Sequence, residues 1–303
     1  MKKNKAIFIL GPTAVGKTYF GVKLAKMLDG EIISSDSVQI FKGLDIGSAK
    51  VTKEEMQGVV HHGIDIKEAN EEFSVFEFVE YTKQKISDIT KRGKLPIVVG
   101  GTGLYVKALL GGFDFGGTNK DENLRSQLET LAEEKGNDYL FEKLKEKNPQ
   151  MAQKTDKFNT VRLVRALEIA LSGGEKGKSE SDIEACVIAL NRDRQKLYDD
   201  INRRVDTMLE RGLVEEVENL KKCGISSKNQ AMKAIGYKEV LSYLDGEIDF
   251  DRMKELIKQH SRNYAKRQLT FLRGMDDVSY IDTEDKEKAY QQIMELVKNF
   301  LES

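Results

Sequence analysis

Residues 11–18 read Gly-Pro-Thr-Ala-Val-Gly-Lys-Thr, and this stretch decides the fold of the chain. It follows the apolar run 6–10 and precedes an amphipathic segment at residues 19–28. A strand, a glycine-rich turn and a helix in this order are the context in which the pattern G-x-x-x-x-G-K-[ST] forms a P-loop. The stretch therefore predicts a cradle of backbone N–H groups that binds a di- or triphosphate.

The fixed positions of this pattern have separate physical roles. Gly11 and Gly16 let the backbone turn tightly and approach phosphate oxygens. Lys17 supplies a mobile cation, and the Thr18 hydroxyl can reach a Mg²⁺ ion, which we expect as the cofactor. A strand–helix turn that matches by chance is the alternative, but both flanks fit the pattern. The residues expected to bind the phosphate groups are Gly11, Pro12, Thr13, Ala14, Val15, Gly16, Lys17 and Thr18.

The composition excludes several classes of protein. The 303 residues carry a formal net charge of −1, with 39% hydrophobic and 33% charged residues, which is typical of a globular protein without a global basic field. Cys186 and Cys223 lie far apart and lack the spacing of a metal site. No apolar run approaches the ~20 residues of a membrane-spanning helix. We expect a cytoplasmic protein that does not bind membranes.

Further apolar runs predict the other strands of a sheet. They occupy residues 31–35, 61–66, 95–99 and 185–190, and helical segments such as 73–92 separate them. This alternation favours an α/β fold, namely a P-loop kinase-like parallel sheet flanked by helices. Ligands bind beyond the carboxyl ends of parallel strands, so the residues that follow each run are candidate site residues.

Two of these strand ends carry distinct chemistry. Asp36 follows the run 31–35, so the topology places its carboxylate near the P-loop; a turn or a helix N-cap is the alternative role. The run 95–99 is followed by Gly100-Gly-Thr-Gly103, where P-loop NTPases usually carry an acidic residue for Mg²⁺ and water. Backbone N–H groups and one hydroxyl suit an anion better than a cation. This turn argues against an ATP-driven motor or switch.

The composition changes in the middle of the chain. Glycines in residues 111–117 predict a flexible connector, and residues 121–147 show two charged amphipathic helices. We expect residues 114–158 to form a small helical insertion, while residues 1–113 and 159–303 form the P-loop core with a helical C-terminal part. Within 159–303 we predict a mobile loop at 172–181 and helices at 161–169, 197–222, 229–244 and 258–273.

The last of these helices is basic. Residues 258–273 contain no acid, and at 100° per residue Lys258, Arg262, Lys266 and Arg273 fall on one arc. Such a stripe suits the phosphate backbone of a nucleic acid. A solvated helix face is the alternative interpretation.

Taken together, the motifs resemble those of the bacterial tRNA dimethylallyltransferases, and the resemblance spans nearly the whole chain. Many kinases share the P-loop alone, whereas its combination with Ser35-Asp-Ser-Val-Gln39 and Gly100-Gly-Thr-Gly-Leu-Tyr105 is specific. Further matching motifs are Leu44-Asp-Ile-Gly-Ser-Ala-Lys50, Arg162-Leu-Val-Arg-Ala-Leu-Glu168, Ile201-Asn-Arg-Arg-Val-Asp206, Gly212-Leu-Val-Glu-Glu-Val217, Ile235-Gly-Tyr-Lys-Glu239 and Ala265-Lys-Arg-Gln-Leu-Thr-Phe-Leu-Arg273.

That family transfers a dimethylallyl group from its diphosphate to the exocyclic N6 amine of adenosine 37 in the anticodon loop of tRNA, and releases pyrophosphate. The resemblance implies dimethylallyl diphosphate and the anticodon stem-loop as partners of a monomeric enzyme. It makes Asp36 the general base, which accepts a proton as the C–N bond forms, because an aryl amine is too weak an acid to lose it in advance. It places Arg204 on the diphosphate and Thr102 near the reacting atoms.

The resemblance also implies contacts with tRNA. Two of the residues depart from the family, because Phe271 stands where a Trp is common and Val161 where a Gln is common. Phe keeps the stacking surface of Trp. The full set is Ser37, Val38, Gln39, Arg125, Val161, Arg162, Arg165, Lys233, Gly236, Tyr237, Lys238, Lys266, Arg267, Gln268, Phe271 and Arg273.

Three other functions fit parts of the sequence. A small-molecule kinase would use ATP at the same P-loop and would need no prenyl donor. A prenyltransferase that acts on free adenylate would need neither the insertion nor the basic helix. A noncatalytic tRNA-binding module would leave Lys17 and Asp36 without a role.

Overall fold

The computed structural model describes residues 3–111, 122–171 and 182–303. The chain forms two compact units, one made of Met1–Leu110 with Ser181–Ser303 and the other of Gly111–Glu180. The predicted connector at 111–117, apart from its first residue, and the predicted loop at 172–181 lie outside the described residues.

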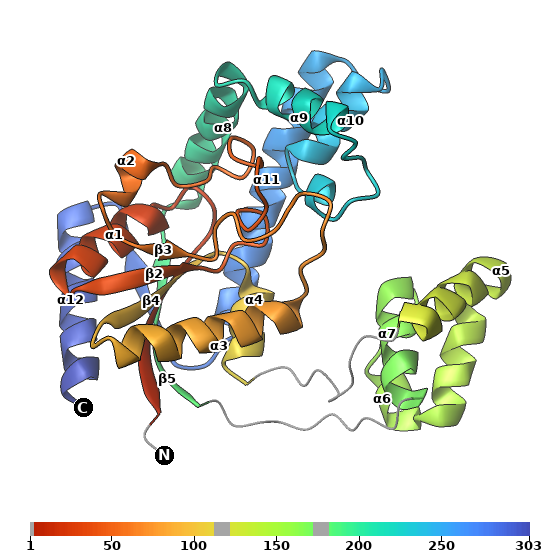
Figure 1. The fold of residues 1–303 in the computed structure, drawn as a ribbon, viewed down its shortest axis with the longest axis horizontal. Coiled ribbons are helices and arrows are strands. Elements are labelled where there is room, and N and C mark those ends of the chain that lie inside the picture. The colour runs from red at the N-terminus through yellow and green to blue at the C-terminus, as the bar shows by residue number, and fades with distance from the viewer. Residues whose placement is uncertain (1–2, 112–121, 172–181) are drawn as a thin grey trace. The chain divides into compact units, whose positions relative to one another are not determined.

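The first unit is built on a sheet of six parallel strands in the order β3-β2-β4-β1-β5-β6 (Figure 1). β1 (Asn4–Leu10) lies between β4 (Leu95–Gly100) and β5 (Ile183–Asn191). The P-loop therefore follows a central strand and lies at the carboxyl ends of the strands, where parallel sheets bind ligands. The parallel α/β fold predicted from the sequence is confirmed. The remaining strands are β2 (Gly30–Ser34), β3 (His61–His62) and β6 (Val278–Asp282).

One face of the sheet packs against two helices that are far apart in the sequence. Ile7 and Ile9 point to this face and are fully buried in a core that they share with α1 (Lys17–Met27) and α12 (Lys286–Glu302). Alternate side chains of a strand point to opposite faces, so the neighbouring residues of β1 serve the other side.

The other face of the sheet packs against α3 (Val75–Lys91), which is helical over most of the predicted range. α4 (Gly103–Leu109) begins directly after the Gly-Gly-Thr-Gly turn and lies beside α3. The rings of Phe78 and Tyr105 stack between these two helices with centroids 4.2 Å apart. This contact anchors the turn to the core.

Most helices of the C-terminal part lie toward the carboxyl ends of the strands, whereas α12 lies against one face of the sheet (Figure 1). Two helices that the sequence predicts as continuous are interrupted in the structure. Gly212, with a φ of 94°, separates two helices within 197–222, and Gly236, with a φ of 95°, precedes the only α-helix within 229–244. The helices are α8 (Arg194–Glu210), α9 (Leu213–Lys222), the short 3₁₀ helix η1 (Ala231–Lys233), α10 (Tyr237–Leu244) and α11 (Phe250–Arg273).

Several elements differ from the sequence expectation. β6 and α12 were not predicted, although β6 extends the sheet beyond β5 and α12 covers it. The strand expected at 61–66 has two residues, and the one-turn helix α2 (Lys53–Met56) precedes it. An edge strand needs few apolar residues, which leaves little pattern in the sequence.

The second unit is a small helical bundle of α5 (Glu122–Lys147), α6 (Pro149–Gln153) and α7 (Thr160–Leu171). Gly136 breaks α5 into the two amphipathic helices that the sequence predicts. The structure differs from the predicted boundary at residue 158, because α7 packs against α5 and belongs to the same unit. The shared core contains Leu128, Leu140, Leu144, Leu163 and Leu167.

Candidate active site

The P-loop runs from the end of β1 into the first turn of α1. Lys17 is the first residue of that helix, and its Nζ donates a hydrogen bond to the carbonyl oxygen of Pro12 at 2.7 Å. Burial and the positive charge of Arg204 lower the pKa of Lys17 to about 7, although the charge of Asp36 opposes this shift. Lys17 is therefore ready to gain a proton when an anion binds beside it.

A cavity of about 290 Å³, which we call the P-loop cavity, opens in front of the loop. Its lining combines cationic and hydroxyl groups of the loop with a hydrophobic wall. Such a combination fits an anionic group attached to a small apolar group. The polar lining includes Lys17, Thr18 and Arg204, and the apolar lining includes Ile32, Val51, Ile64 and Val99.

Arg204 reaches the P-loop from α8. Its Nη1 donates a hydrogen bond to the Thr13 Oγ1 at 3.3 Å. Burial lowers the pKa of this guanidinium, and the negative charge of Asp36 opposes the shift. The structure thus brings Arg204 to the P-loop, and its expected role on the diphosphate stays a prediction.

Asp36 has two kinds of contact. Its Oδ1 accepts hydrogen bonds from the backbone N–H groups of Val38 at 2.9 Å and Gln39 at 3.3 Å. The turn-forming role considered as the alternative is therefore real. The same carboxylate acts electrostatically on Lys17 and Arg204, so it also belongs to the phosphate site.

A second cavity of about 330 Å³ adjoins the first. The two cavities meet at Asp36, which lines both of them. Their other shared lining residues are Thr13, Ser48, Arg204 and Tyr264. The second cavity collects residues that the sequence places on tRNA, namely Ser37, Val38, Lys233, Gly236, Lys238 and Arg267.

Gln39 differs from this set, because it lines the P-loop cavity. Its Oε1 accepts from the Ser34 hydroxyl at 3.4 Å, and its Nε2 donates to the carbonyl oxygens of Ser48 at 3.4 Å and Ala49 at 3.3 Å. Gln39 therefore ties the end of β2 to a neighbouring loop, and its expected contact with the RNA base stays a prediction.

The Gly-Gly-Thr-Gly turn holds a hydroxyl and an aromatic ring. The Thr102 Oγ1 is buried next to Tyr264, and a side-chain hydrogen bond from Thr102 acts against the raised pKa of that tyrosine. A Cβ atom at Gly103 would lie 2.2 Å from the ring of Phe271, so the ring packs directly on the turn. The predicted RNA-stacking ring is thus also part of the site's frame.

Gln268 joins the two glycine-containing turns. Its Oε1 accepts from the N–H of Thr13, and its Nε2 donates to the carbonyl oxygen of Gly101, both at 2.9 Å. The residue is buried. We therefore assign Gln268 a positioning role in place of the predicted contact with tRNA.

Tyr237 is another predicted tRNA contact that the structure contradicts. The residue is 0% exposed, and its hydroxyl donates to the Glu216 carboxylate at 2.7 Å. The tyrosine occupies the buried side of the first turn of α10, while the adjacent Lys238 is exposed. The sequence pattern around Gly236 did not indicate that Tyr237, and not Lys238, faces the core.

The basic stripe of α11 is divided between two surroundings. Lys258 lies 2.8 Å from the Asp206 carboxylate, and Arg262 Nη1 donates to the Asn202 side chain at 2.5 Å, so both bind α8. These two residues are not the free cations that the stripe predicted. Lys266 and Arg273, together with Arg267, are exposed.

In the second unit, two predicted tRNA contacts are paired within the protein. Arg125 and Arg165 lie 2.8 and 2.9 Å from the carboxylate of Glu168, which is 0% exposed. The spacing of Arg165 and Glu168, three residues apart on a helix, was a signal for this pair. Arg162 is exposed, and Val161 is 79% exposed, so these two residues remain accessible.

Tyr264 and Ser48 line both cavities but were not among the predicted site residues. Burial, and next the charge of Asp36, raises the pKa of Tyr264 to about 12. Its hydroxyl therefore stays protonated at neutral pH. The signal for this residue was its place one turn before Gln268 on the buried face of α11.

Among the described residues, no three His, Cys, Asp or Glu side chains come together as a metal site, and no helix has the length and apolar character to cross a membrane. Mg²⁺ commonly needs one or two protein oxygens, with water and substrate phosphates as its other ligands. Thr18 lines the P-loop cavity and is exposed, and Asp36 lines the same cavity. These residues fit an ion that binds together with a diphosphate.

A central strand, its P-loop and two adjoining cavities define a P-loop protein that holds a phosphate-bearing substrate next to a second substrate. The chain belongs to the IPP transferase family, whose model matches residues 39–275.

Individual relatives agree with this family. The chain is 47% identical to a tRNA dimethylallyltransferase of Exiguobacterium sp. over 99% of its own length and 98% of the relative's. It is similar in structure to the full-length tRNA isopentenylpyrophosphate transferase of Bacillus halodurans, with a TM-score of 0.77, 43% identity, and coverage of 99% of this chain and 97% of the other. A eukaryotic dimethylallyltransferase that acts on tRNA gives a TM-score of 0.84 at 27% identity, with coverage of 99% and 80%.

Proposed function

We propose that this protein transfers a dimethylallyl group from dimethylallyl diphosphate to the N6 amine of adenosine 37 in the anticodon loop of tRNA, and releases pyrophosphate. Family membership supports prenyl transfer to tRNA. The observation that carries the assignment of residues is the junction of the two cavities at Asp36. A phosphate cradle lies on one side of this carboxylate and a basic cavity on the other.

The P-loop cavity holds the donor in this proposal. Backbone N–H groups of the loop, Lys17 and Arg204 neutralise the charge that develops on the departing pyrophosphate. A Mg²⁺ ion held at Thr18 would supply further neutralisation of the same charge. The apolar wall, which includes Ile32 and Val99, keeps water away from the allylic carbon.

Asp36 accepts the proton of the reaction. The amine nitrogen attacks the allylic carbon while the C–O bond to the diphosphate breaks, and the bonding electron pair leaves with pyrophosphate. The nitrogen gains positive charge during the attack, and one of its protons moves to the carboxylate. The two backbone hydrogen bonds to Oδ1 hold this carboxylate in place.

The second cavity receives the adenine base. The base must leave its stack, which costs a few kcal/mol and is easier in a loop than in a duplex. Lys233, Lys238 and Arg267 line this cavity and lie where phosphates of the anticodon loop would pass. The exposed Lys266 and Arg273 on α11 continue the basic surface.

The second unit contacts the tRNA through its exposed residues in this proposal. Arg162 and Val161 are accessible at the start of α7, whereas Arg125 and Arg165 shape the unit through Glu168. The monomeric state and the cytoplasmic location expected from the sequence stay predictions.

Incubation of the protein with unmodified tRNA and labelled dimethylallyl diphosphate tests the proposal. We expect label in one adenosine of the anticodon loop and one pyrophosphate per prenylated base. A tRNA with guanosine at position 37 lacks the N6 amine and should stay unlabelled. Added ATP should not be consumed, because the alternative kinase function is not favoured by the family. Stoichiometric ADP, or faster labelling of free adenylate than of tRNA, would contradict the proposal.

A further inference from the structure

The loop at residues 44–50 has no part in the chemistry described so far, although its sequence is one of the distinctive motifs of the chain. Gly47 and Ser48 belong to this loop and line the second cavity. Ser48 also lines the P-loop cavity. The position of the loop therefore sets part of the wall that an acceptor base would meet.

One carboxylate from α9 binds three consecutive backbone N–H groups of this loop. The Glu216 Oε2 accepts from Asp45 at 3.0 Å and from Ile46 at 2.7 Å, and its Oε1 accepts from Gly47 at 3.1 Å. Hydrogen bonds to an ionised carboxylate are among the strongest in proteins. Glu216 thus fixes the backbone of the loop directly before Ser48.

Tyr237 of α10 binds the same carboxylate. Its hydroxyl donates to the Glu216 Oε1 at 2.7 Å, and burial raises the pKa of this hydroxyl, so it remains a donor. A Cβ atom at Gly47 would lie 2.6 Å from the tyrosine ring, which shows how closely the loop backbone packs on it. The loop, α9 and α10 therefore meet at one carboxylate.

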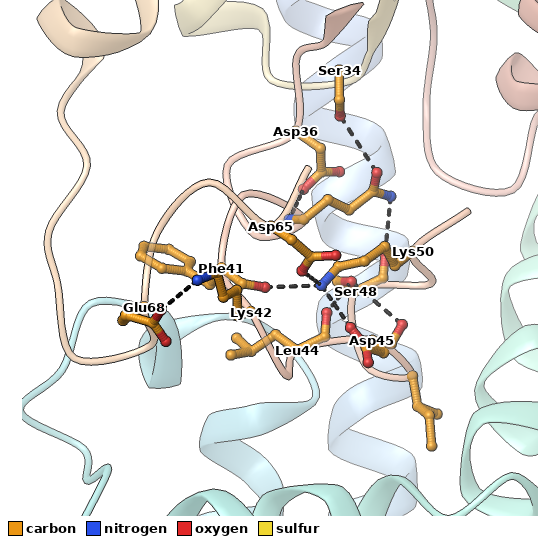
Figure 2. Close-up of polar contacts among 12 residues, drawn as sticks. Ser34, Asp36, Phe41, Lys42, Leu44, Asp45, Ser48, Lys50, Asp65 and Glu68 are labelled. Carbon is orange, nitrogen blue, oxygen red and sulfur yellow. Dashed lines mark hydrogen bonds and ion pairs between the residues drawn. The ribbon is translucent and has the colours of Figure 1, made fainter. Parts of the chain in front are cut away.

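The loop is also fixed at its other end (Figure 2). The Lys50 Nζ donates to the carbonyl oxygen of Phe41 at 2.9 Å and binds the carboxylates of Asp45 at 2.6 Å and Asp65 at 2.5 Å. The Ser48 hydroxyl donates a hydrogen bond to the carbonyl oxygen of Leu44 at 2.6 Å. With both ends tied, the loop backbone between them has a defined place.

We propose that Glu216 is a positioning residue for the acceptor: by binding the loop N–H groups of residues 45–47, it holds the Gly47–Ser48 wall of the second cavity where the tRNA base is received. This inference rests on the proposed function, because it names the second cavity as the acceptor site. The P-loop backbone takes no part in these hydrogen bonds, so we expect Glu216 to affect tRNA more than dimethylallyl diphosphate.

Glu216→Gln tests the proposal with little change in shape. The amide keeps one oxygen for Asp45 and Ile46 but turns an NH₂ group toward the N–H of Gly47, where two donors then face each other. We expect kcat/KM for tRNA to fall by about tenfold or more, because hydrogen bonds to a charged group are lost. The affinity for dimethylallyl diphosphate should stay within about twofold of wild type, because Glu216 makes no hydrogen bond to the P-loop.

Two further variants act as controls. Tyr237→Phe removes one hydrogen bond to the carboxylate and keeps the ring, so it should show the same selectivity for tRNA with a smaller effect. Glu218→Gln lies on the same helix, where Glu218 is exposed and pairs with Lys222 at 3.3 Å, and should leave both substrates unaffected. Unchanged tRNA kinetics in Glu216→Gln, or equal losses for both substrates, would overturn the inference.

Hydrogen exchange separates this inference from the proposed function. The amides of residues 45–47 should exchange faster in Glu216→Gln than in wild type, while those of the P-loop stay protected. Unchanged exchange at 45–47 would overturn the inference even in a fully active enzyme. A wild-type protein that does not prenylate tRNA at all would instead overturn the proposed function, whatever the exchange result.

Discussion

Binding of the diphosphate is expected to weaken as the pH rises, because Lys17 must carry a proton in the complex. Burial and the charge of Arg204 lower the pKa of Lys17 to about 7 in the free protein. A bound diphosphate supplies negative charge beside the amine and raises this pKa again. Above pH 7, Lys17 is mostly neutral in the protein without ligand. Binding of the diphosphate therefore takes up a proton, and the affinity falls as the pH rises.

The size of this effect follows from the pKa of Lys17 in the free protein. Above pH 7, the dissociation constant should rise about tenfold per pH unit, for as long as the pKa in the complex stays higher. Between pH 6 and pH 8.5 the total change is about 30-fold, or about 2 kcal/mol. Calorimetry with pyrophosphate in buffers of different ionisation enthalpy counts the protons directly. We expect about zero protons taken up at pH 6 and about one at pH 8.5.

Pyrophosphate titrates in the same range, so the measurement needs a matched variant. Lys17→Arg keeps a positive charge that does not titrate below pH 12 or so. The difference between wild type and Lys17→Arg in proton uptake and in pH dependence therefore reports Lys17 alone. Identical pH profiles for the two proteins would refute the reasoning, because Lys17 would then be charged in the free protein.

Three further predictions concern single side chains. Asp36→Asn should slow single-turnover prenyl transfer about 10²–10⁴-fold while tRNA affinity is kept, and near-normal turnover would leave Asp36 with its turn-forming role alone. Arg273→Ala should lower the slope of log affinity for tRNA against log salt by about one, whereas Lys258→Ala should not, because Lys258 is paired with Asp206; equal slopes in salt titrations would make the α11 surface a solvated face. Lys17→Met should raise the free energy of unfolding at pH 7 by up to about 4 kcal/mol in denaturant titrations, because the unfolded lysine binds a proton that the folded site disfavours; an unchanged midpoint would contradict this.

The sequence predicted the parts of the site that follow directly from strand ends. A P-loop after an apolar strand, and Asp36 after the next one, have positions that parallel topology dictates. Arg204 lies some 190 residues beyond the P-loop, so only the resemblance to a family placed it there, and the hydrogen bond to Thr13 agrees with that placement. Backbone pattern alone does not bring such distant residues together.

The errors concern residues whose partners are distant in the sequence. Tyr237 and Gln268 are polar side chains in motifs that contain exposed cations, and nothing in the local pattern shows that they are buried. Lys258 belongs to a helix face that is basic throughout, but Asp206 on α8 neutralises part of that face. Ion pairs and hydrogen bonds between elements depend on packing, which a helical or strand period does not encode.

The central place of β1 has a consequence for the synthesis of the chain. β1 pairs with β4 on one side and with β5 on the other, and the whole second unit lies between Gly100 and Ile183 in the sequence. At about 5–20 residues per second, the ribosome needs roughly 4–16 s to make these ~80 residues, during which one edge of β1 stays unpaired. An open apolar strand edge invites aggregation. The small helical bundle has local contacts and can fold before β5 is made. The sheet around the phosphate cradle is therefore completed late, when β5 pairs with β1.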